Sequence, residues 1–343
     1  MTNNPLIPQS KLPQLGTTIF TQMSALAQQH QAINLSQGFP DFDGPRYLQE
    51  RLAHHVAQGA NQYAPMTGVQ ALREAIAQKT ERLYGYQPDA DSDITVTAGA
   101  TEALYAGITA LVRNGDEGIC FDPSYDSYAP AIALSGGIVK RMALQPPHFR
   151  VDWQEFAALL SERTRLVILN TPHNPSATVW QQADFAALWQ AIAGHEIFVI
   201  SDEVYEHINF SQQGHASVLA HPQLRERAVA VSSFGKTYHM TGWKVGYCVA
   251  PAPISAEIRK VHQYLTFSVN TPAQLALADM LRAEPEHYLA LPDFYRQKRD
   301  ILVNALNESR LEILPCEGTY FLLVDYSAVS TLDDVEFCQW LTQ

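Results

Sequence analysis

TRLVILNTPHNPSATVWQQADFAALWQAIAGHEIFVISDEVY, residues 164–205, is the stretch that decides the fold class of this chain. Residues 164–172 form a continuous apolar run, which predicts a strand buried on both faces. Residues 182–194 show the apolar spacing of an amphipathic helix, and residues 196–205 form a second apolar strand. A strand, a helix and another strand in this order predict a βαβ unit whose two strands run parallel.

The same alternation of strand and helix extends through the residues on either side of this unit. We predict further strands at residues 93–99, 117–125 and 227–233, and helices at residues 100–112 and 128–137. The chain is therefore predicted to be an α/β protein with a mostly parallel sheet.

The character of the sequence changes after about residue 273. Residues 273–281 and 293–309 predict helices, and residues 311–327 predict two strands around a glycine turn. We therefore expect a large α/β domain accompanied by a smaller α+β domain. The expected boundaries give an N-terminal arm with part of the small domain at 1–40, the large domain at 41–272 and the small domain at 273–343.

Length and charge limit the classes of function. The chain has 343 residues, of which 46% are hydrophobic, and this is enough for a deep site. A formal net charge of -12 without any basic run argues against a nucleic-acid partner. The sequence shows neither a signal peptide nor an apolar stretch that could span a bilayer, so we expect a cytoplasmic protein with no membrane partner.

The four cysteines lie far apart in the sequence. They form no CxxC pair and have no histidine nearby at metal-ligand spacing. We therefore expect buried thiols, without disulfides and without a metal site.

Polar side chains gather where the predicted strands end, which is where open α/β sheets bind ligands. Lys236 follows the strand at 227–233, and Asn174 lies among turn-forming residues after another strand. Asp202 leaves an apolar strand, where a buried carboxylate needs a cationic partner. Tyr205 comes three residues after Asp202, so the two side chains can face the same space. Gly99 precedes a helix start, whose free N–H groups favour a phosphate.

Taken singly, each of these residues has a simpler explanation, such as a solvated lysine, a plain loop or a tight turn. Together they meet the needs of one cofactor. Pyridoxal 5'-phosphate needs an amine for a Schiff base, an acid for its ring nitrogen, donors for its phenolic oxygen, an aromatic ring to stack on and an anion site. The sequence has a candidate for each.

Seven motifs, in chain order, carry a resemblance to a known family. The stretches GATEALY, DPSYDSY, NTPHNPSA, SDEVYE and SFGKTYHMTGWKVGY resemble the class I/II, fold-type I, aminotransferases. With LSQGFPDFDGP and NQYAPMTGVQALREAI they are similar to the branch that holds the methionine, kynurenine and glutamine–phenylpyruvate aminotransferases. The resemblance runs from about residue 15 to the end of the chain.

The resemblance implies a pyridoxal-phosphate-dependent aminotransferase. It would move the amino group of methionine or an aromatic amino acid to a 2-oxo acid by a ping-pong mechanism. Lys236 would form the Schiff base and carry the Cα proton, and Asp202 would keep the pyridine nitrogen protonated. Tyr205 and Asn174 would bind the phenolic oxygen, and Tyr125 would stack on the ring.

The resemblance also assigns the phosphate and substrate contacts. Tyr63 would reach the phosphate of the neighbouring subunit, which implies a homodimer with shared active sites. Gly38 would lie against the substrate carboxylate, and Asn174 would contact the substrate as well. Many relatives have arginine at position 244, and a lysine there binds phosphate less directionally. The remaining phosphate contacts would come from Gly99, Ala100, Thr101, Ser233 and Lys244.

Two features depart from the family pattern. In relatives the chain continues beyond Gln343 into a strand that carries the arginine for the substrate carboxylate. We therefore expect a small domain that is C-terminally incomplete, and a chain that binds the cofactor better than it processes amino acids. Gly107 and Gly118 stand where relatives usually carry larger residues.

Two other functions stay open at this point. One is a cysteine-conjugate β-lyase on the same fold, in which a leaving group departs from Cβ after the Cα proton is removed. The other is a non-catalytic regulator that binds pyridoxal phosphate. A nucleotide-binding α/β protein is disfavoured, because no G-x-G-x-x-G or P-loop follows the first strand.

Overall fold

The structure is a computed structural model that describes residues 8–36, 38 and 40–343. The chain forms two compact units, one made of Met1–Gly38 with Tyr326–Gln343 and the other of Phe39–Asp325. The domain boundaries expected at residues 40 and 272 stay predictions.

The larger unit is built on a seven-stranded sheet with the order β1-β7-β6-β5-β4-β2-β3. The neighbours from β3 to β6 run parallel, whereas β7 is antiparallel to both β1 and β6. This confirms the predicted α/β fold with a mostly parallel sheet. The strands are β1 (Ile94–Thr97), β2 (Glu117–Asp122), β3 (Ile138–Ala143), β4 (Thr164–Asn170), β5 (Phe198–Asp202), β6 (Ala228–Ser233) and β7 (Gly246–Val249).

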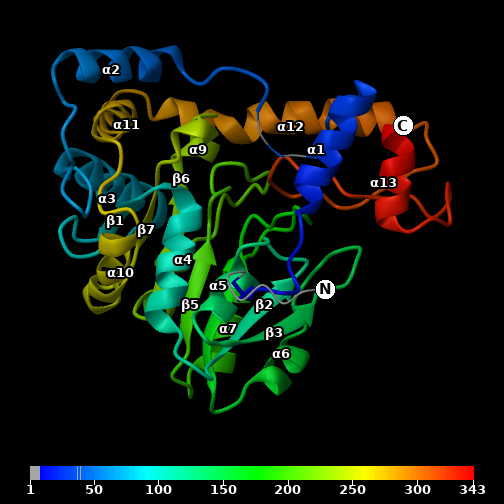
Figure 1. The fold of residues 1–343 in the computed structure, drawn as a ribbon, viewed down its shortest axis with the longest axis horizontal. Helices are drawn as coiled ribbons and strands as arrows, with labels where there is room; N and C mark the ends of the chain where they lie inside the picture. The colour runs from blue at the N-terminus through cyan, green and yellow to red at the C-terminus, as the bar shows by residue number, and fades with distance from the viewer. Residues whose placement is uncertain (1–7, 37, 39) are drawn as a thin grey trace. The chain divides into compact units, whose positions relative to one another are not determined.

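Helices flank this sheet, and α4 packs across β5, β6 and β7 (Figure 1). The helices of the larger unit are α2 (Arg46–Ala57), α3 (Gln70–Tyr84), α4 (Gly99–Leu111), α5 (Tyr128–Leu134), α6 (Trp153–Leu159), α7 (Gln182–Ile192), α8 (Pro222–Arg225), α9 (Phe234–Thr237), α10 (Ala252–Leu265), α11 (Thr271–Ala283) and α12 (Glu286–Leu306), with the 3₁₀ turns η1 (Val218–Ala220) and η2 (Thr241–Trp243). A two-stranded antiparallel sheet, β8 (Glu312–Ile313) with β9 (Val324–Asp325), completes it. In the smaller unit, α1 (Ile19–His30) packs on α13 (Asp334–Thr342).

The two central strands, β4 and β5, are buried on both faces, as their apolar sequences predict. Leu166 and Ile168 of β4 belong to a core cluster that includes residues of α4. Val167 and Leu169, between and after them, belong to the core cluster on the other face. Because successive strand residues point to opposite faces, this pattern places helices or loops over both sides of the sheet.

The register of the parallel strands brings their carboxyl ends together. Asn170 of β4 pairs with Asp202 of β5, and Asp202 pairs with Val231 of β6. Ser233, the last residue of β6, pairs with Gly246 at the start of the antiparallel β7. The polar residues that follow these strands therefore meet at one edge of the sheet.

Most predicted elements are confirmed, among them the helices at 100–112 and 182–194 and the two strands within 311–327. The strand predicted at 196–205 is too long, because it ends at Asp202. Beyond Asp202 the backbone turns, and the Glu206 N–H donates to the Glu203 carbonyl at 2.9 Å.

Among the described residues, no helix combines the length and apolar character needed to cross a membrane. The same part of the chain holds no group of three or more His, Cys, Asp or Glu residues arranged for a metal ion. Cys120 and Cys248 are buried, as predicted, but the prediction of a buried thiol is wrong for Cys338, which is exposed on α13.

Gly107 lies inside α4, so a substitution at this position tests how much the glycine costs in stability. A Cβ placed on Gly107 would meet only the Cδ1 of Ile200, at 3.3 Å, which is the end of a flexible side chain. Gly107→Ala should therefore raise the free energy of unfolding by about 0.5–1 kcal/mol, because glycine loses more backbone freedom than alanine in a helix. Urea unfolding measures this difference in the free energy of unfolding, provided that the slope of the free energy against urea concentration is unchanged.

Gly99→Ala is the matched control for this substitution. Gly99 opens the same helix with a φ of 76°, which alanine adopts only with strain. We expect this variant to be less stable than the parent chain. A Gly107→Ala midpoint at or below the parent value would show that Ile200 cannot give way.

Candidate active site

The predicted site residues meet where the parallel strands end. Asp202 and Ser233 are the last residues of β5 and β6, and Lys236 lies in α9 directly after β6. Asn174 follows β4, and Tyr125 follows β2. The start of α4 supplies the remaining group from this region, which is Gly99, Ala100 and Thr101.

Asp202 is buried, with 3% of its surface exposed. Its Oδ2 accepts a hydrogen bond from the Tyr128 hydroxyl at 2.6 Å, whereas its Oδ1 accepts only a long bond, 3.3 Å, from the Val204 N–H. Burial raises the pKa of Asp202 to about 6, although Tyr128 and Lys236 act in the opposite direction. The weakly bonded Oδ1 is therefore suited to accept a hydrogen bond from a charged N–H group.

The raised pKa of Asp202 makes its charge costly in the folded chain. The folded-state pKa of about 6 lies above the ordinary value of 3.8, so the folded chain binds the proton more tightly than the unfolded chain. Asp202 therefore lowers the free energy of unfolding as the pH rises from 3.8 to about 6. The loss is roughly 3 kcal/mol above this range, and a cationic partner at Oδ1 would offset it.

Lys236 lies among tyrosines. Its Nζ donates a hydrogen bond to the Tyr320 hydroxyl at 2.6 Å and lies 5.4 Å from the ring centroid of Tyr205. The rings of Tyr205 and Tyr320 meet edge to face, with their centroids 5.3 Å apart. Burial raises the pKa of Tyr205 well above its ordinary value, so its hydroxyl keeps its proton. The half-buried amine of Lys236 and the buried hydroxyl of Tyr205 thus lie in one aromatic environment.

The Asn174 loop is tied to the end of β5 through a second asparagine. The Asn174 N–H donates to the Asn170 Oδ1 at 2.7 Å. The Asn170 Nδ2 in turn donates to the Asp202 carbonyl at 2.8 Å. This chain of bonds fixes the loop relative to Asp202, and it explains why the two segments lie together although 28 residues separate them in sequence.

Tyr125 lies beside Tyr128, which bonds Asp202. The two rings meet edge to face with their centroids 5.7 Å apart. The Tyr125 hydroxyl is 3.4 Å from the Thr101 Oγ1, so the ring spans from the start of α4 toward the Asp202 side.

The start of α4 has the features of an anion site. The helix has no side-chain N-cap, so its first N–H groups lack that partner. The Nζ of Lys244 lies 3.4 Å from where a Cβ of Gly99 would be. Gly246 allows β7 to approach α4, because a Cβ on it would lie 2.8 Å from the Ala100 nitrogen. An ammonium group beside the positive end of a helix favours a bound anion between them.

Two further residues, Tyr63 and Gly38, were predicted to contact the phosphate and the substrate. Tyr63 lies between α2 and α3 and is 82% exposed, with its ring edge to face against Phe267 at 5.4 Å. Gly38 belongs to the smaller unit, so its contact with the substrate stays a prediction.

Two tyrosines that were not predicted from the sequence, Tyr128 and Tyr320, contact the predicted residues. Tyr128 bonds Asp202, and its place three residues after Tyr125 in DPSYDSY was an available signal. Tyr320 bonds Lys236 from a segment 84 residues away, and no local pattern indicates that contact.

The groups at this edge fit pyridoxal phosphate. They comprise an amine (Lys236), a buried carboxylate with one weakly bonded oxygen (Asp202), a neutral hydroxyl (Tyr205) and an anion site at the start of α4. The carboxylate suits the ring N–H, and the helix start suits a phosphate.

Comparisons with known proteins agree with this chemistry. The family model for aminotransferase class I and II matches residues 30–343. The chain is 99% identical to the methionine aminotransferase of Escherichia coli (strain K12) over 100% of this chain and 89% of that protein. It is 33% identical to a kynurenine–oxoglutarate transaminase of Dictyostelium discoideum, over 95% of this chain and 80% of that protein.

A solved structure is similar over nearly the whole chain. The crystal structure of YbdL from Escherichia coli, described as identifying a methionine aminotransferase function, has a TM-score of 0.98 and 99% identity. The match covers 99% of this chain and 89% of that chain. The fold-type I architecture expected from the sequence is thereby confirmed.

The effect of the Tyr128 hydrogen bond on the pKa of Asp202 can be tested by substitution. Tyr128→Phe removes a donor to the charged carboxylate, so the pKa of Asp202 should rise above its value of about 6. A bond to a charged group corresponds to a rise of about one to two pH units. Carboxyl carbon NMR of the cofactor-free protein measures the pKa directly.

Tyr125→Phe serves as the control, because its hydroxyl bonds Thr101 rather than Asp202. This variant should keep the pKa of Asp202 near that of the parent chain. Equal pKa values in the parent chain and in Tyr128→Phe would contradict the role given to the Tyr128 hydroxyl.

Proposed function

The chain belongs to the class I and II aminotransferases, and we propose that it moves the amino group of methionine or an aromatic amino acid to a 2-oxo acid. The cofactor of this family is pyridoxal 5'-phosphate. The observation that carries the proposal is the buried Asp202, whose Oδ1 has only a 3.3 Å bond, at the same sheet edge as Lys236. The 99% identity to a methionine aminotransferase supports methionine as the donor.

In this proposal each group at the edge has one task. Asp202 Oδ1 accepts the hydrogen bond of the pyridine N–H, and Tyr205 and Asn174 contact the phenolic oxygen. Tyr125 covers one face of the ring. The phosphate is held by Gly99, Ala100, Thr101, Ser233 and Lys244.

The chemistry follows from these positions. Bound pyridoxal phosphate supplies a sink for the electron pair that remains when the donor's Cα loses its proton. Asp202, kept ionised by its cationic partner, holds the proton on the ring nitrogen. Lys236 accepts the Cα proton at its Nζ and delivers it again, as a general base and then a general acid. The Tyr320 hydroxyl, 2.6 Å from this Nζ, holds the amine in place.

The surroundings of Lys236 favour an apolar donor. The rings of Tyr205 and Tyr320 both lie within 5.5 Å of its Nζ, at 5.4 and 5.3 Å. Contact with these two aromatic rings suits the thioether of methionine or an aromatic side chain better than a charged side chain. The small-molecule partners are therefore methionine or an aromatic amino acid and a 2-oxo acid.

We also propose that the protein is a homodimer with shared sites, in which Tyr63 reaches the phosphate of the partner subunit. Three large side chains are exposed at the end of α10 and just after it, and Tyr63 contacts one of them, Phe267. Exposed large apolar side chains of this kind suit contact with a second copy of the chain. They are Tyr63, Tyr264, Leu265 and Phe267. The cytoplasmic location stays a prediction.

The first test replaces the two central residues. Lys236→Ala should lose transfer from methionine, phenylalanine and kynurenine by about 10²–10⁴-fold, the contribution typical of a positioned general base. Asp202→Asn should bind the cofactor yet lose most of the activity, because an amide cannot keep the ring nitrogen protonated. Absorbance changes of the bound cofactor on adding each donor measure the half-reaction.

Lys260→Ala is the control, because Lys260 is an exposed lysine paired with Glu257 on α10. It should react at the parent rate. Unchanged rates in Lys236→Ala or Asp202→Asn would refute the assignment of that residue. Ammonia and pyruvate released from a cysteine conjugate without a 2-oxo acid would instead indicate the lyase reaction.

The second test concerns the shared site. In a mixed dimer of Tyr63→Phe and Lys236→Ala chains, one site receives an intact Lys236 and an intact Tyr63 from different subunits. Mixing equal amounts should restore roughly one quarter of the sites to the parent form. Activity above the mean of the two separate variants supports the exchange, and activity equal to that mean contradicts it.

A further inference from the structure

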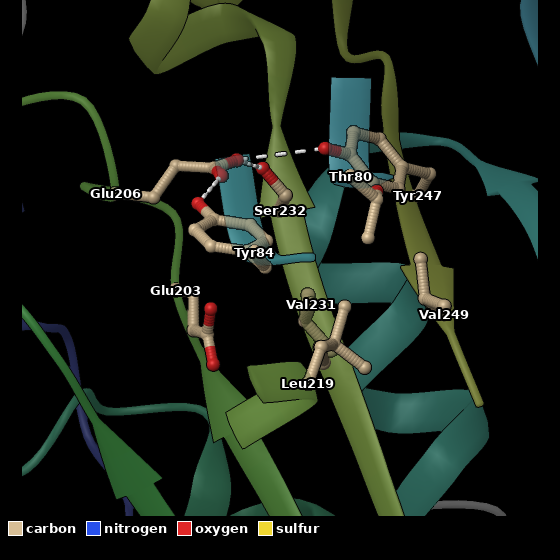
Figure 2. A pocket seen from close by; sticks show the side chains of 10 residues that line it. Thr80, Tyr84, Glu203, Glu206, Leu219, Val231, Ser232, Tyr247 and Val249 are labelled. Atoms are coloured by element: carbon tan, nitrogen blue, oxygen red, sulfur yellow. Dashed lines mark hydrogen bonds between the residues drawn. The ribbon is translucent and has the colours of Figure 1, made fainter. Parts of the chain in front are cut away.

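A second cluster of polar residues is buried next to the strand ends that carry the candidate site. At its centre is Glu206, toward which the side chains of Tyr84, Ser232 and Tyr247 point (Figure 2). The Tyr84 and Ser232 hydroxyls both donate hydrogen bonds to this carboxylate. The aminotransferase mechanism uses none of these groups directly.

An ion pair completes the cluster. The Lys79 Nζ lies 2.6 Å from the Glu206 Oε1, and each side chain is only 3% exposed. Lys79 also donates to the Tyr247 hydroxyl at 2.8 Å. Burial alone would lower the pKa of Lys79 and raise that of Glu206, but each charge beside the other reverses the shift. Both groups therefore stay ionised inside the protein.

The turn after β5 divides its side chains between this cluster and the candidate site. Asp202 bonds Tyr128, and Tyr205 packs against Tyr320. Glu206, the next residue after Tyr205, instead bonds the buried cluster.

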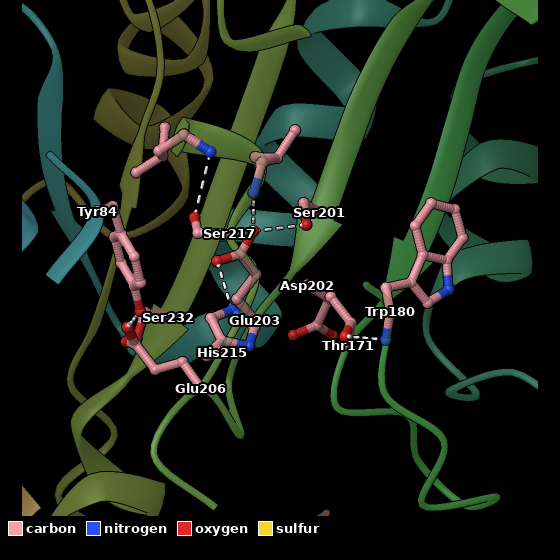
Figure 3. Close-up of polar contacts among 12 residues, drawn as sticks. Tyr84, Thr171, Trp180, Ser201, Asp202, Glu203, Glu206, His215, Ser217 and Ser232 are labelled. Carbon is pink, nitrogen blue, oxygen red and sulfur yellow. Dashed lines mark hydrogen bonds and ion pairs between the residues drawn. The ribbon is translucent and has the colours of Figure 1, made fainter. Parts of the chain in front are cut away.

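Glu203 anchors the same turn a second time (Figure 3). Its Oε1 accepts hydrogen bonds from the Ser201 hydroxyl at 2.7 Å and the Val218 N–H at 2.9 Å. Its Oε2 is 2.9 Å from the His215 Nε2. Two buried carboxylates thus hold the turn that presents Asp202 and Tyr205.

The cluster also bonds the neighbouring strand ends. Ser232 directly precedes Ser233, which is the last residue of β6 before the helix of Lys236. Tyr247 is in β7, three residues after Lys244. Lys79, on α3, bonds both Glu206 of the turn and Tyr247 of β7.

Stability alone does not account for a buried pair of this kind. Taking two charges out of water is expensive, and apolar replacements of similar shape are often equally stable or more stable. Apolar side chains, however, cannot supply directional hydrogen bonds. Hydrogen bonds that the Glu206 carboxylate accepts from α3, β6 and β7 fix the positions of those three segments relative to one another.

We propose that Lys79, Glu206 and Ser232 are positioning residues of the aminotransferase site, which set the distances between the Tyr205 turn, the end of β6 and the Lys236 helix. The inference rests on the proposed function, because it assumes that these segments hold pyridoxal phosphate. Groups that bind a ligand must lie within about 0.5 Å of the productive geometry, and supporting bonds provide that accuracy.

The double variant Lys79→Met/Glu206→Gln tests the proposal. It keeps the shape of both side chains and leaves no buried charge unpaired, so the thermal midpoint of the cofactor-free protein should stay within about 5 °C of the parent value. The dissociation constant for pyridoxal phosphate should rise about tenfold, and kcat with methionine should fall about 10- to 100-fold. The near-UV circular dichroism of the bound cofactor should change as well.

Glu117→Gln/Lys140→Met is the matched control. Glu117 is equally buried and lies 2.7 Å from Lys140, but it is the first residue of β2, at the other end of the sheet from the candidate site. This pair should leave the cofactor affinity, the circular dichroism and kcat as in the parent chain.

Several results would overturn the proposal. Parent-like affinity, dichroism and kcat in Lys79→Met/Glu206→Gln would do so, and so would equal losses in both double variants, which would indicate a general loss of stability. If the double variant fails to fold, Ser232→Ala decides, because it removes one hydroxyl and should still weaken cofactor binding; unchanged binding contradicts the proposal. The parent chain is measured alongside, and its failure to bind pyridoxal phosphate would contradict the proposed function itself.

Discussion

The register between β4 and β5 is the constraint on which the candidate site depends. Asn170 pairs with Asp202, and the Asn170 side chain then bonds both the Asp202 carbonyl and the Asn174 N–H. A slip of one residue would turn every side chain of β5 to the opposite face. Asp202 would then lie on the side of Glu203, and its carboxylate would lose Tyr128. The apolar residues on both faces of β4 and β5 prevent this slip, so core packing and site geometry have one cause.

Asp202 shows how the folded chain holds an unfavourable group where the proposed reaction would need it. The carboxylate is buried at a cost in stability, and only one of its oxygens has a short bond. A bound pyridinium would supply the missing partner, so cofactor affinity and charge burial are linked. By contrast, the charge of Glu206 is already matched by Lys79. Two carboxylates four residues apart thus have different partners: Glu206 lies 2.6 Å from a buried ammonium group, whereas Asp202 bonds the Tyr128 hydroxyl and the Val204 N–H.

The sequence predicted the parts of the site that lie next to regular elements. Lys236, Asp202 and the start of α4 follow from strand ends and helix starts, which local patterns reveal. Tyr320 and Lys79 did not follow, because their contacts with Lys236 and Glu206 span 84 and 127 residues and leave no local signal. The predicted strand at 196–205 was too long, because Val204 and Tyr205 continue its apolar pattern after the backbone has turned. β7 was not predicted, because the first two of its four residues belong to the polar motif that contains Lys236.

The antiparallel β7 has a consequence for the order in which the protein can be assembled during synthesis. β1 pairs only with β7 in the main sheet, and β7 lies between β1 and β6. About 150 residues separate the two partners, so this edge of the sheet has a high contact order. A ribosome that adds 5–20 residues per second needs roughly 8 to 30 s between releasing β1 and releasing β7. Throughout that interval β1 lacks its partner strand in the main sheet, and the close approach of β7 to the start of α4 cannot form. This end of the candidate site is therefore completed only after β5 and β6 have emerged.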